Sequence, residues 1–177
     1  MKRNAVLLSR NILMLYDSSD KAIANTGRYQ KNEIVPCNEL ARECISYIEV
    51  NMGCSSIQFE TELPDSFSIK TNRLFLTRTI RELLRNAVKY SDGLHISVLL
   101  TQTDTTICFT VEDIGSGLPE NSKEMIFMPF IKVDDQSEGL GLGLPLCKAH
   151  MDGLGGRIFF DENYKEGCRV IIELPKE

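Results

Sequence analysis

The sequence has no surplus of basic residues, no low-complexity segment and only two histidines. Its 177 residues contain 20 lysines and arginines against 25 aspartates and glutamates, which gives a formal net charge of −5. This balance excludes a broad basic surface, so we expect no nucleic-acid partner. Any anion that the protein binds must be held by local groups rather than by its overall charge.

Closely spaced cysteines and long apolar runs are also absent. The six cysteines lack the spacing of metal ligands, and most lie in apolar stretches, which indicates reduced core thiols of a cytoplasmic protein. The N-terminal apolar run, residues 5–15, is interrupted by Ser9, Arg10 and Asn11. It is too short to cross a bilayer or to act as a signal peptide, so we expect no membrane contact by this chain.

The chain does have enough apolar sequence, 42% of its residues, for one core with a short appendage. Alternating patterns predict strands at 33–35, 57–59, 67–69, 94–100, 105–111, 156–161 and 168–174. Helical spacing predicts helices at 3–17, 38–48, 72–90 and 142–151, with Asn38 as the N-cap of the second. This mixture predicts an α+β fold, a two-layer α/β sandwich with helices on one face of a mixed sheet.

The helix at 72–90 has a polar face. At about 100° per residue, Glu82, Asn86 and Lys89 fall within an arc of roughly 60°, with Tyr90 at its edge. Taken alone, such a face is most often simply solvated. Magnesium prefers hard oxygen ligands and keeps several waters, so the amide oxygen of Asn86 together with phosphate oxygens would suffice to hold it.

Two glycine-rich runs follow. Asp113 precedes Gly115 and Gly117, which places a carboxylate beside backbone that can approach a flat ring closely; an ordinary turn after a strand is the alternative. The second run leads into a helix whose free N–H groups favour phosphate, with Pro145 in the first turn. It comprises Gly139, Leu140, Gly141, Leu142, Gly143 and Leu144.

In this order and spacing, the three runs resemble the N box and the two glycine boxes of the GHKL ATPases, with the Bergerat-type fold. The closest resemblance is to the catalytic ATP-binding domain of sensor histidine kinases. It covers roughly residues 30–175. It implies that the chain binds ATP and Mg²⁺, with Asn86 as the metal ligand.

The resemblance also implies the roles of the other motif residues. Glu82 would lie near the γ-phosphate and its water, Lys89 and Tyr90 would approach the nucleotide, and Asp113 would accept a hydrogen bond from the adenine amine. The run 125–132 resembles the phenylalanine box, with Phe130 at the nucleotide and Lys132 near the γ-phosphate; alone, its phenylalanines would be ordinary core. Residues 133–138 would form a mobile ATP lid.

One position departs from the family. The threonine that normally supports the adenine-binding aspartate corresponds here to Cys168, whose thiol is a weaker hydrogen-bonding group. The phosphate acceptor is missing as well, because the family places its acceptor histidine on an upstream dimerisation helix. His95 and His150 are both interpreted as structural, His95 as an outward-facing residue of the strand at 94–100.

We therefore expect residues 31–177 to be the ATP-binding domain of a two-component sensor histidine kinase. Residues 1–30 are either a remnant of its dimerisation domain with a connector or a packing helix of the same domain. The implied partners are the histidine-bearing dimerisation domain and a response-regulator receiver domain, in the cytoplasm or on the cytoplasmic part of a membrane-bound sensor. The alternative is a nucleotide-binding regulatory module, anti-sigma-like or a degenerate kinase, which acts through a protein partner.

Overall fold

The computed structural model describes residues 31, 33–54, 57–91, 95–119, 122–123, 125–132 and 141–176. Strands and helices alternate irregularly along this part of the chain. The strands are β1 (Glu33–Pro36), β2 (Gln58–Thr61), β3 (Ser68–Thr71), β4 (Ile96–Gln102), β5 (Thr106–Asp113), β6 (Arg157–Phe160) and β7 (Cys168–Pro175). The helices are α2 (Cys37–Met52), α3 (Arg73–Tyr90), α4 (Gly143–Gly153) and the 3-10 turn η1 (Met125–Phe127).

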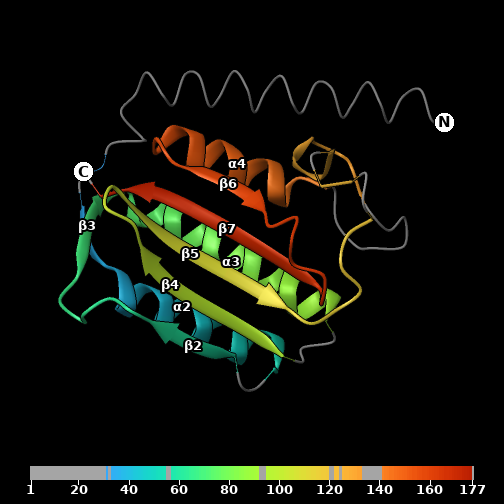
Figure 1. Ribbon diagram of the computed structural model, residues 1–177, viewed down its shortest axis with the longest axis horizontal. Coiled ribbons are helices and arrows are strands. Elements are labelled where there is room, and N and C mark those ends of the chain that lie inside the picture. The colour runs from blue at the N-terminus through green and yellow to red at the C-terminus, as the bar shows by residue number, and fades with distance from the viewer. Residues whose placement is uncertain are drawn as a thin grey trace.

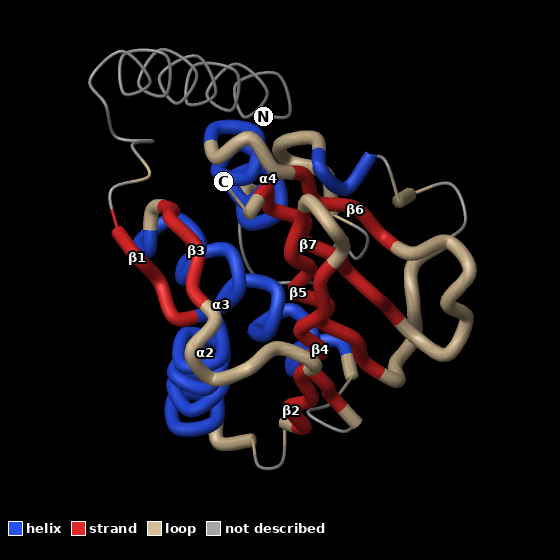
Figure 2. The backbone as a smooth tube through the Cα atoms, turned by 60° about the vertical axis from the view of Figure 1, so that its left-hand side comes forward, coloured by secondary structure: helices blue, strands red, loops and turns tan. Residues whose placement is uncertain are grey.

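A five-stranded sheet of order β2-β4-β5-β7-β6 forms one layer (Figure 1). The pair β2–β4 is parallel and the other pairs are antiparallel, so the sheet is mixed. Strands β1 and β3 form a separate antiparallel pair. Figure 2 shows the three α-helices on the same side of the large sheet. The predicted two-layer α+β arrangement is confirmed.

The core lies between these layers because both contribute one apolar face. Helix α3 buries the residues that recur at helical spacing, and β4, β5 and β7 bury alternate side chains. Phe109, Leu76 and Ile80 are each fully buried. Burial of such a side chain stabilises the fold by about 1.5–3 kcal/mol. These contacts leave the opposite face of α3 available for polar groups.

Two local predictions were wrong. Asn38 does not cap α2, because the helix begins at Cys37 and Pro36 is its N-cap. Asn38 is instead buried, with its amide donating to the Leu63 carbonyl at 3.0 Å and accepting from the Thr61 hydroxyl at 2.8 Å. His95 lies outside β4 rather than in it, with a positive φ of 50°.

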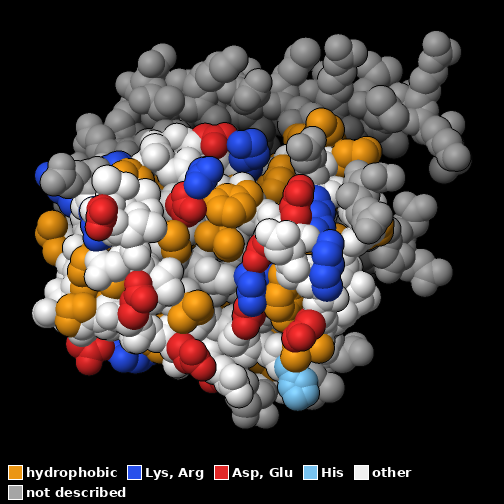
Figure 3. Space-filling model, in the orientation of Figure 1, with side chains coloured by type: hydrophobic (Ala, Val, Ile, Leu, Met, Phe, Trp, Pro, Cys, Tyr) orange, Lys and Arg blue, Asp and Glu red, His pale blue; other side chains and the backbone are white. Residues whose placement is uncertain are grey.

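The face of the sheet away from the helices carries both polar and apolar side chains (Figure 3). Acidic and basic side chains lie beside one another on it, as expected for a sheet with one solvated face. The six cysteines are free. Cys37, Cys44 and Cys147 are buried as expected of core thiols, whereas Cys54, Cys108 and Cys168 are only half-buried. Within the described ranges, no helix is both long and apolar enough to cross a membrane.

Candidate functional site

Helix α3 forms one wall of the candidate site. It begins cleanly because the Asn72 side chain accepts a hydrogen bond from the Phe75 amide at 3.1 Å. Its apolar stripe anchors it against the sheet. On the opposite face Glu82 and Asn86 are half-buried, whereas Tyr90 is 43% exposed. Eight residues separate Glu82 from Tyr90, or about 12 Å along the helix axis.

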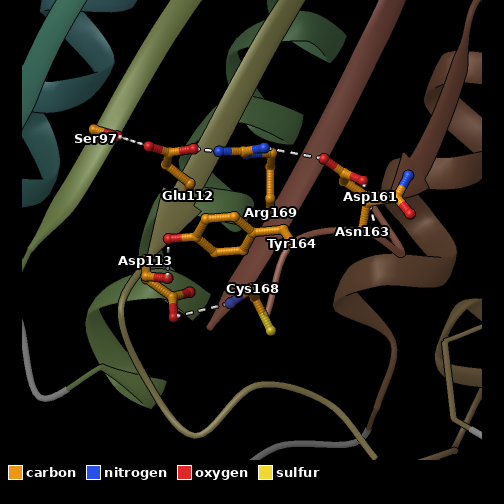
Figure 4. Close-up of polar contacts among 8 residues, drawn as sticks. All are labelled: Ser97, Glu112, Asp113, Asp161, Asn163, Tyr164, Cys168 and Arg169. Carbon is orange, nitrogen blue, oxygen red and sulfur yellow. Dashed lines mark hydrogen bonds and ion pairs between the residues drawn. The ribbon is translucent and has the colours of Figure 1, made fainter. Parts of the chain in front are cut away.

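The carboxylate of Asp113 lies at the end of β5 and is only 4% exposed. The backbone N–H of Cys168 donates to its Oδ1 at 3.3 Å (Figure 4). Burial raises the pKa of Asp113, and the Cys168 N–H partly offsets this by favouring the anion. As a carboxylate, Asp113 is a nearly buried acceptor with unused lone pairs, suited to an N–H donor on a ligand.

The main chain of Cys168, rather than its thiol, therefore contacts Asp113. Figure 4 shows the Cys168 sulfur turned away from the carboxylate. The weaker hydrogen bonding of a thiol thus matters less here than the sequence indicated, since a backbone N–H is supplied by any residue other than proline at this position.

Gly115 follows β5 and lies against the last residues of α3. A Cβ atom on Gly115 would lie 2.8 Å from the Asp113 Oδ1 and 2.8 Å from the Tyr90 carbonyl oxygen. Real Cβ atoms do not approach other atoms so closely, so the site requires glycine here. The first glycine run therefore lies against the last turn of the helix that carries Glu82 and Asn86.

The other end of the polar face meets the second glycine run. A Cβ atom on Gly143 would lie 2.7 Å from the Cδ of Glu82, so the first residue of α4 directly faces the Glu82 carboxyl group. Glu82 also pairs with Arg85, one turn further along α3. No side chain caps the N-terminus of α4, and Pro145 in its first turn has no N–H. The remaining N–H groups there can bind an anion.

The phenylalanine-containing segment is bonded to the second glycine run. The Phe130 amide donates to the Gly141 carbonyl at 3.0 Å, and both residues have positive φ, 65° and 67°. Phe127 packs against Phe160 with ring centroids 5.3 Å apart. Phe127 is half-buried and packs against the core, whereas Phe130 is hydrogen-bonded to Gly141 just before α4 and Lys132 is exposed.

The structure thus brings most of the predicted residues into two linked groups. Asp113, Gly115 and Tyr90 form one, with Gly117 beside Gly167 at its edge, and Glu82, Gly143, Gly141 and Phe130 form the other. Asn86 and Lys89 both lie on α3 between Glu82 and Tyr90, and the Leu144 side chain packs on the core. Gly139, Leu140, the predicted lid at 133–138 and the predicted helix at 3–17 lie outside the described residues.

Neither histidine joins these groups. His150 stacks on Phe75 with ring centroids 4.6 Å apart, and burial lowers its pKa to about 4. His95 precedes β4 at the surface. Across the described ranges, no three His, Cys, Asp or Glu side chains are grouped in a way that could hold a metal ion. Asn86 and Glu82, on one helix face, still offer the hard oxygens that suit Mg²⁺ shared with phosphate.

Sequence reasoning missed one polar cluster beside Asp113. Tyr164 donates from its hydroxyl to the Asp113 carbonyl at 3.2 Å, and Arg169 bonds Glu112 and Asp161 (Figure 4). Tyr164 belongs to a turn-rich segment 51 residues from Asp113. No motif or spacing marked it, because its link to the site depends on the pairing of β5 with β7.

The sequence matches one known family and several curated proteins. Residues 71–177 match the family described as histidine kinase-, DNA gyrase B-, and HSP90-like ATPase. The chain is 30% identical to the alginate biosynthesis sensor protein KinB of Pseudomonas aeruginosa, over 95% of this chain and 29% of that protein. It is 34% identical to the sensor protein CiaH of Streptococcus pneumoniae, over 62% of this chain and 27% of that protein. The chain spans less than a third of the length of either relative.

Solved structures show the same fold. The nucleotide-free catalytic domain of histidine kinase ThkA superimposes with a TM-score of 0.71 at 28% identity, covering 81% of this chain and 97% of that one. The mycobacterial sensor histidine kinase MprB superimposes with a TM-score of 0.70 at 24% identity, covering 81% of this chain and 97% of that one.

Proposed function

Because the chain belongs to the histidine kinase-, DNA gyrase B- and HSP90-like ATPases and is a histidine kinase catalytic domain, we propose that it transfers the γ-phosphate of ATP to a histidine outside these 177 residues. ATP binding follows from the family. We further propose which residues bind ATP, that Mg²⁺ accompanies it, and where the acceptor histidine lies.

The observation that supports it most is the placement of both glycine runs against one face of α3. Gly115 lies against the Tyr90 carbonyl, and Gly143 faces Glu82. Glu82 precedes Tyr90 by about 12 Å along the axis of α3. A ligand lying along this face would have a base at the end near Asp113 and an anionic group at the N-terminus of α4. ATP has this polarity.

At the base end, Asp113 would accept a hydrogen bond from the exocyclic amine of adenine. Its carboxylate is almost fully buried, so water competes little for the bond. Guanine carries a carbonyl oxygen in place of that amine, which a carboxylate would repel. This chemistry favours adenine.

At the phosphate end, the uncapped start of α4 would hold phosphate oxygens through backbone N–H groups. Asn86 would hold Mg²⁺ through its amide oxygen, and the ion would neutralise charge on the phosphates. Glu82 would orient water at that ion, with Lys89 and Lys132 contributing positive charge near the nucleotide. The protein would act mainly by positioning the nucleotide.

The acceptor would come from a histidine-bearing dimerisation domain of the parent kinase. His150 is unsuited to this role because its ring is stacked on Phe75 inside the α3–α4 interface. Both KinB and CiaH are named sensor proteins, and this chain matches 29% of KinB and 27% of CiaH. We assign residues 31–177 to the ATP-binding domain and residues 1–30 to a remnant of the dimerisation domain. We propose that this part of the kinase lies in the cytoplasm and that its downstream partner is a response-regulator receiver domain.

Calorimetry of nucleotide binding tests the assignment of the site. The parent chain should bind ATP with Mg²⁺, and Asp113→Asn should weaken binding by roughly 10- to 100-fold through loss of a charged hydrogen bond. Asn86→Ala should abolish the dependence on Mg²⁺. Asp104→Asn in the exposed β4–β5 turn and Asn51→Ala on the exposed side of α2 are matched controls and should bind as the parent does.

Phosphoryl transfer separates the kinase from the regulatory alternative. Mixed with a histidine-bearing dimerisation domain and labelled ATP, the parent chain should label the histidine in a Mg²⁺-dependent reaction. Nucleotide binding without transfer to any supplied domain would favour the regulatory module. Absence of binding at millimolar nucleotide would contradict both the site and the catalytic assignment.

A further inference from the structure

A row of polar contacts crosses the solvent-facing side of the sheet next to Asp113 (Figure 4). The Ser97 hydroxyl on β4 donates to Glu112 Oε1 on β5 at 2.9 Å. From β7, the Nε of Arg169 donates to Glu112 Oε2 at 2.7 Å, and its terminal nitrogen donates to Asp161 at 3.0 Å. Arg169 is therefore held at both edges of its guanidinium group, which limits its motion.

Tyr164 lies between this row and Asp113. The Arg169 guanidinium lies over its ring, 4.2 Å from the centroid, and the phenol donates to the Asp113 carbonyl oxygen at 3.2 Å. The ring is half-buried. Since the ring is held by the cation on one face and by the hydrogen bond at its tip, its position depends on Arg169.

Two hydrogen bonds thus reach Asp113 from this part of the chain, one from the β6–β7 connection and one from the first residue of β7. Tyr164 binds its main-chain carbonyl, and the Cys168 N–H binds its carboxylate. Gly167 lies so close that a Cβ there would come within 2.6 Å of the Gly115 amide nitrogen. The direction of the Asp113 carboxylate is therefore set by a segment outside the three motifs.

The simplest alternative is an ordinary surface ion pair that adds little. The same sheet supplies a close comparison in Arg157 of β6. Its Nε donates to Glu173 of β7 at 2.5 Å, and its guanidinium lies over the Phe159 ring at 4.9 Å. Arg157, like Arg169, pairs with a carboxylate and lies over an aromatic ring, but it has one carboxylate partner where Arg169 has two. The ring under Arg157 also has no hydroxyl that could reach a site residue.

We propose that Tyr164 and Arg169 are positioning residues for nucleotide recognition, and that they set how strongly Asp113 selects the 6-amino group of adenine. The inference rests on the proposed function, since it deepens the role of Asp113 in the same site. Arg169 fixes the Tyr164 ring, Tyr164 fixes the backbone of Asp113, and the carboxylate then lies where a purine amine can donate to it. A hydrogen bond loses strength quickly when its geometry is poor, so small displacements count.

Binding of two purine nucleotides to the full chain tests this positioning. ADP and the analogue that lacks the 6-amino group are titrated into the parent, Tyr164→Phe, Arg169→Gln and the control Arg157→Gln. Tyr164→Phe keeps the ring and removes the hydroxyl. It should weaken ADP binding about 3- to 10-fold and leave binding of the analogue within twofold of the parent, because only ADP uses the carboxylate.

Arg169→Gln should reproduce part of this selective loss, roughly 2- to 5-fold for ADP. Arg157→Gln should leave both affinities within twofold, although it also removes an arginine–carboxylate pair and a cation over an aromatic ring on the same sheet. Equal loss for the two nucleotides in Tyr164→Phe would indicate a general structural role and would overturn the proposal. So would unchanged ADP binding in that variant.

The outcomes also separate this inference from the proposed function. If the parent binds ADP while Tyr164→Phe binds both nucleotides as the parent does, the site assignment stands and only the positioning role fails. If the parent binds neither nucleotide, the proposed function fails and the positioning role fails with it. Thermal unfolding of each variant shows whether the fold is retained.

Discussion

The two ends of the polar face of α3 are built in different ways. The end near Asp113 is enclosed by main chain from three separate segments, with the carboxylate almost fully buried. The end near Glu82 faces the first residue of α4 through a flexible side chain. The first arrangement favours selection among flat bases, which requires fixed geometry. The second allows adjustment around phosphates and a metal ion.

The largest expected effect on stability comes from adding a side chain at the end of the site near Asp113, where main chain encloses the carboxylate. Gly167→Ala would place a Cβ against the Asp113 carbonyl and 2.6 Å from the Gly115 nitrogen, and main chain cannot move aside as a side-chain tip can. We expect the free energy of unfolding to fall by about 2–4 kcal/mol. Urea denaturation measures it. A loss below about 0.5 kcal/mol would mean that this end is no more rigid than the other.

Acid should act on the packing of α4 against α3 through His150, whose ring stacks on Phe75. Its folded pKa of about 4 lies below the usual value of 6.5 because burial disfavours the charged ring. Between these values the unfolded chain binds more protons, so stability is full above pH 6.5 and falls as the pH drops toward 4. We expect a loss on the order of 1–2 kcal/mol, reduced for the solvent that reaches the ring.

Denaturation curves at several pH values, for the parent and His150→Gln, check this effect. The part of the acid dependence between pH 6.5 and 4 that belongs to His150 should disappear in the variant. If both proteins lose stability equally over this interval, the burial of His150 does not govern the effect.

The smallest effect on stability is expected from adding a side chain at the end of the site near Glu82. Gly143→Ala introduces a Cβ against the tip of Glu82, which can rotate away, and alanine favours a helix over glycine. The free energy of unfolding should therefore change by less than about 1 kcal/mol. Urea denaturation beside Gly167→Ala gives the direct contrast. A loss as large as that of Gly167→Ala would remove the distinction between the two ends.

Much of this arrangement could be predicted because it depends on local patterns. The buried stripe of α3 and the polar face with Glu82 and Asn86 follow from helical periodicity, and the structure confirms the helix within one residue of the predicted bounds. The prediction that Asn38 caps the second helix was wrong, because the hydrogen bonds that Asn38 makes when buried near Leu63 and Thr61 outweigh its preference for N-caps. That preference is a local rule, and tertiary contacts override it.

The support for Asp113 could not be predicted in the same way. The sequence comparison set the Cys168 thiol against the threonine hydroxyl of the family, whereas the contact with Asp113 is made by the backbone N–H of Cys168. Tyr164 lies in a turn-rich segment with no periodic pattern, and its partner Arg169 alternates along β7 like any outward-facing strand residue. Their roles depend on which residues face one another across paired strands.

The order of helices and strands, the buried faces and the residues from which a nucleotide site can be built all follow from local patterns, because periodicity and glycine placement act within short stretches of chain. Two features appear only in the folded chain: both glycine runs lie against α3, and Tyr164 and Cys168 hold Asp113. Those contacts join residues far apart in sequence. They exist because β5 pairs with β7 in one register, which sets Asp113 opposite Cys168.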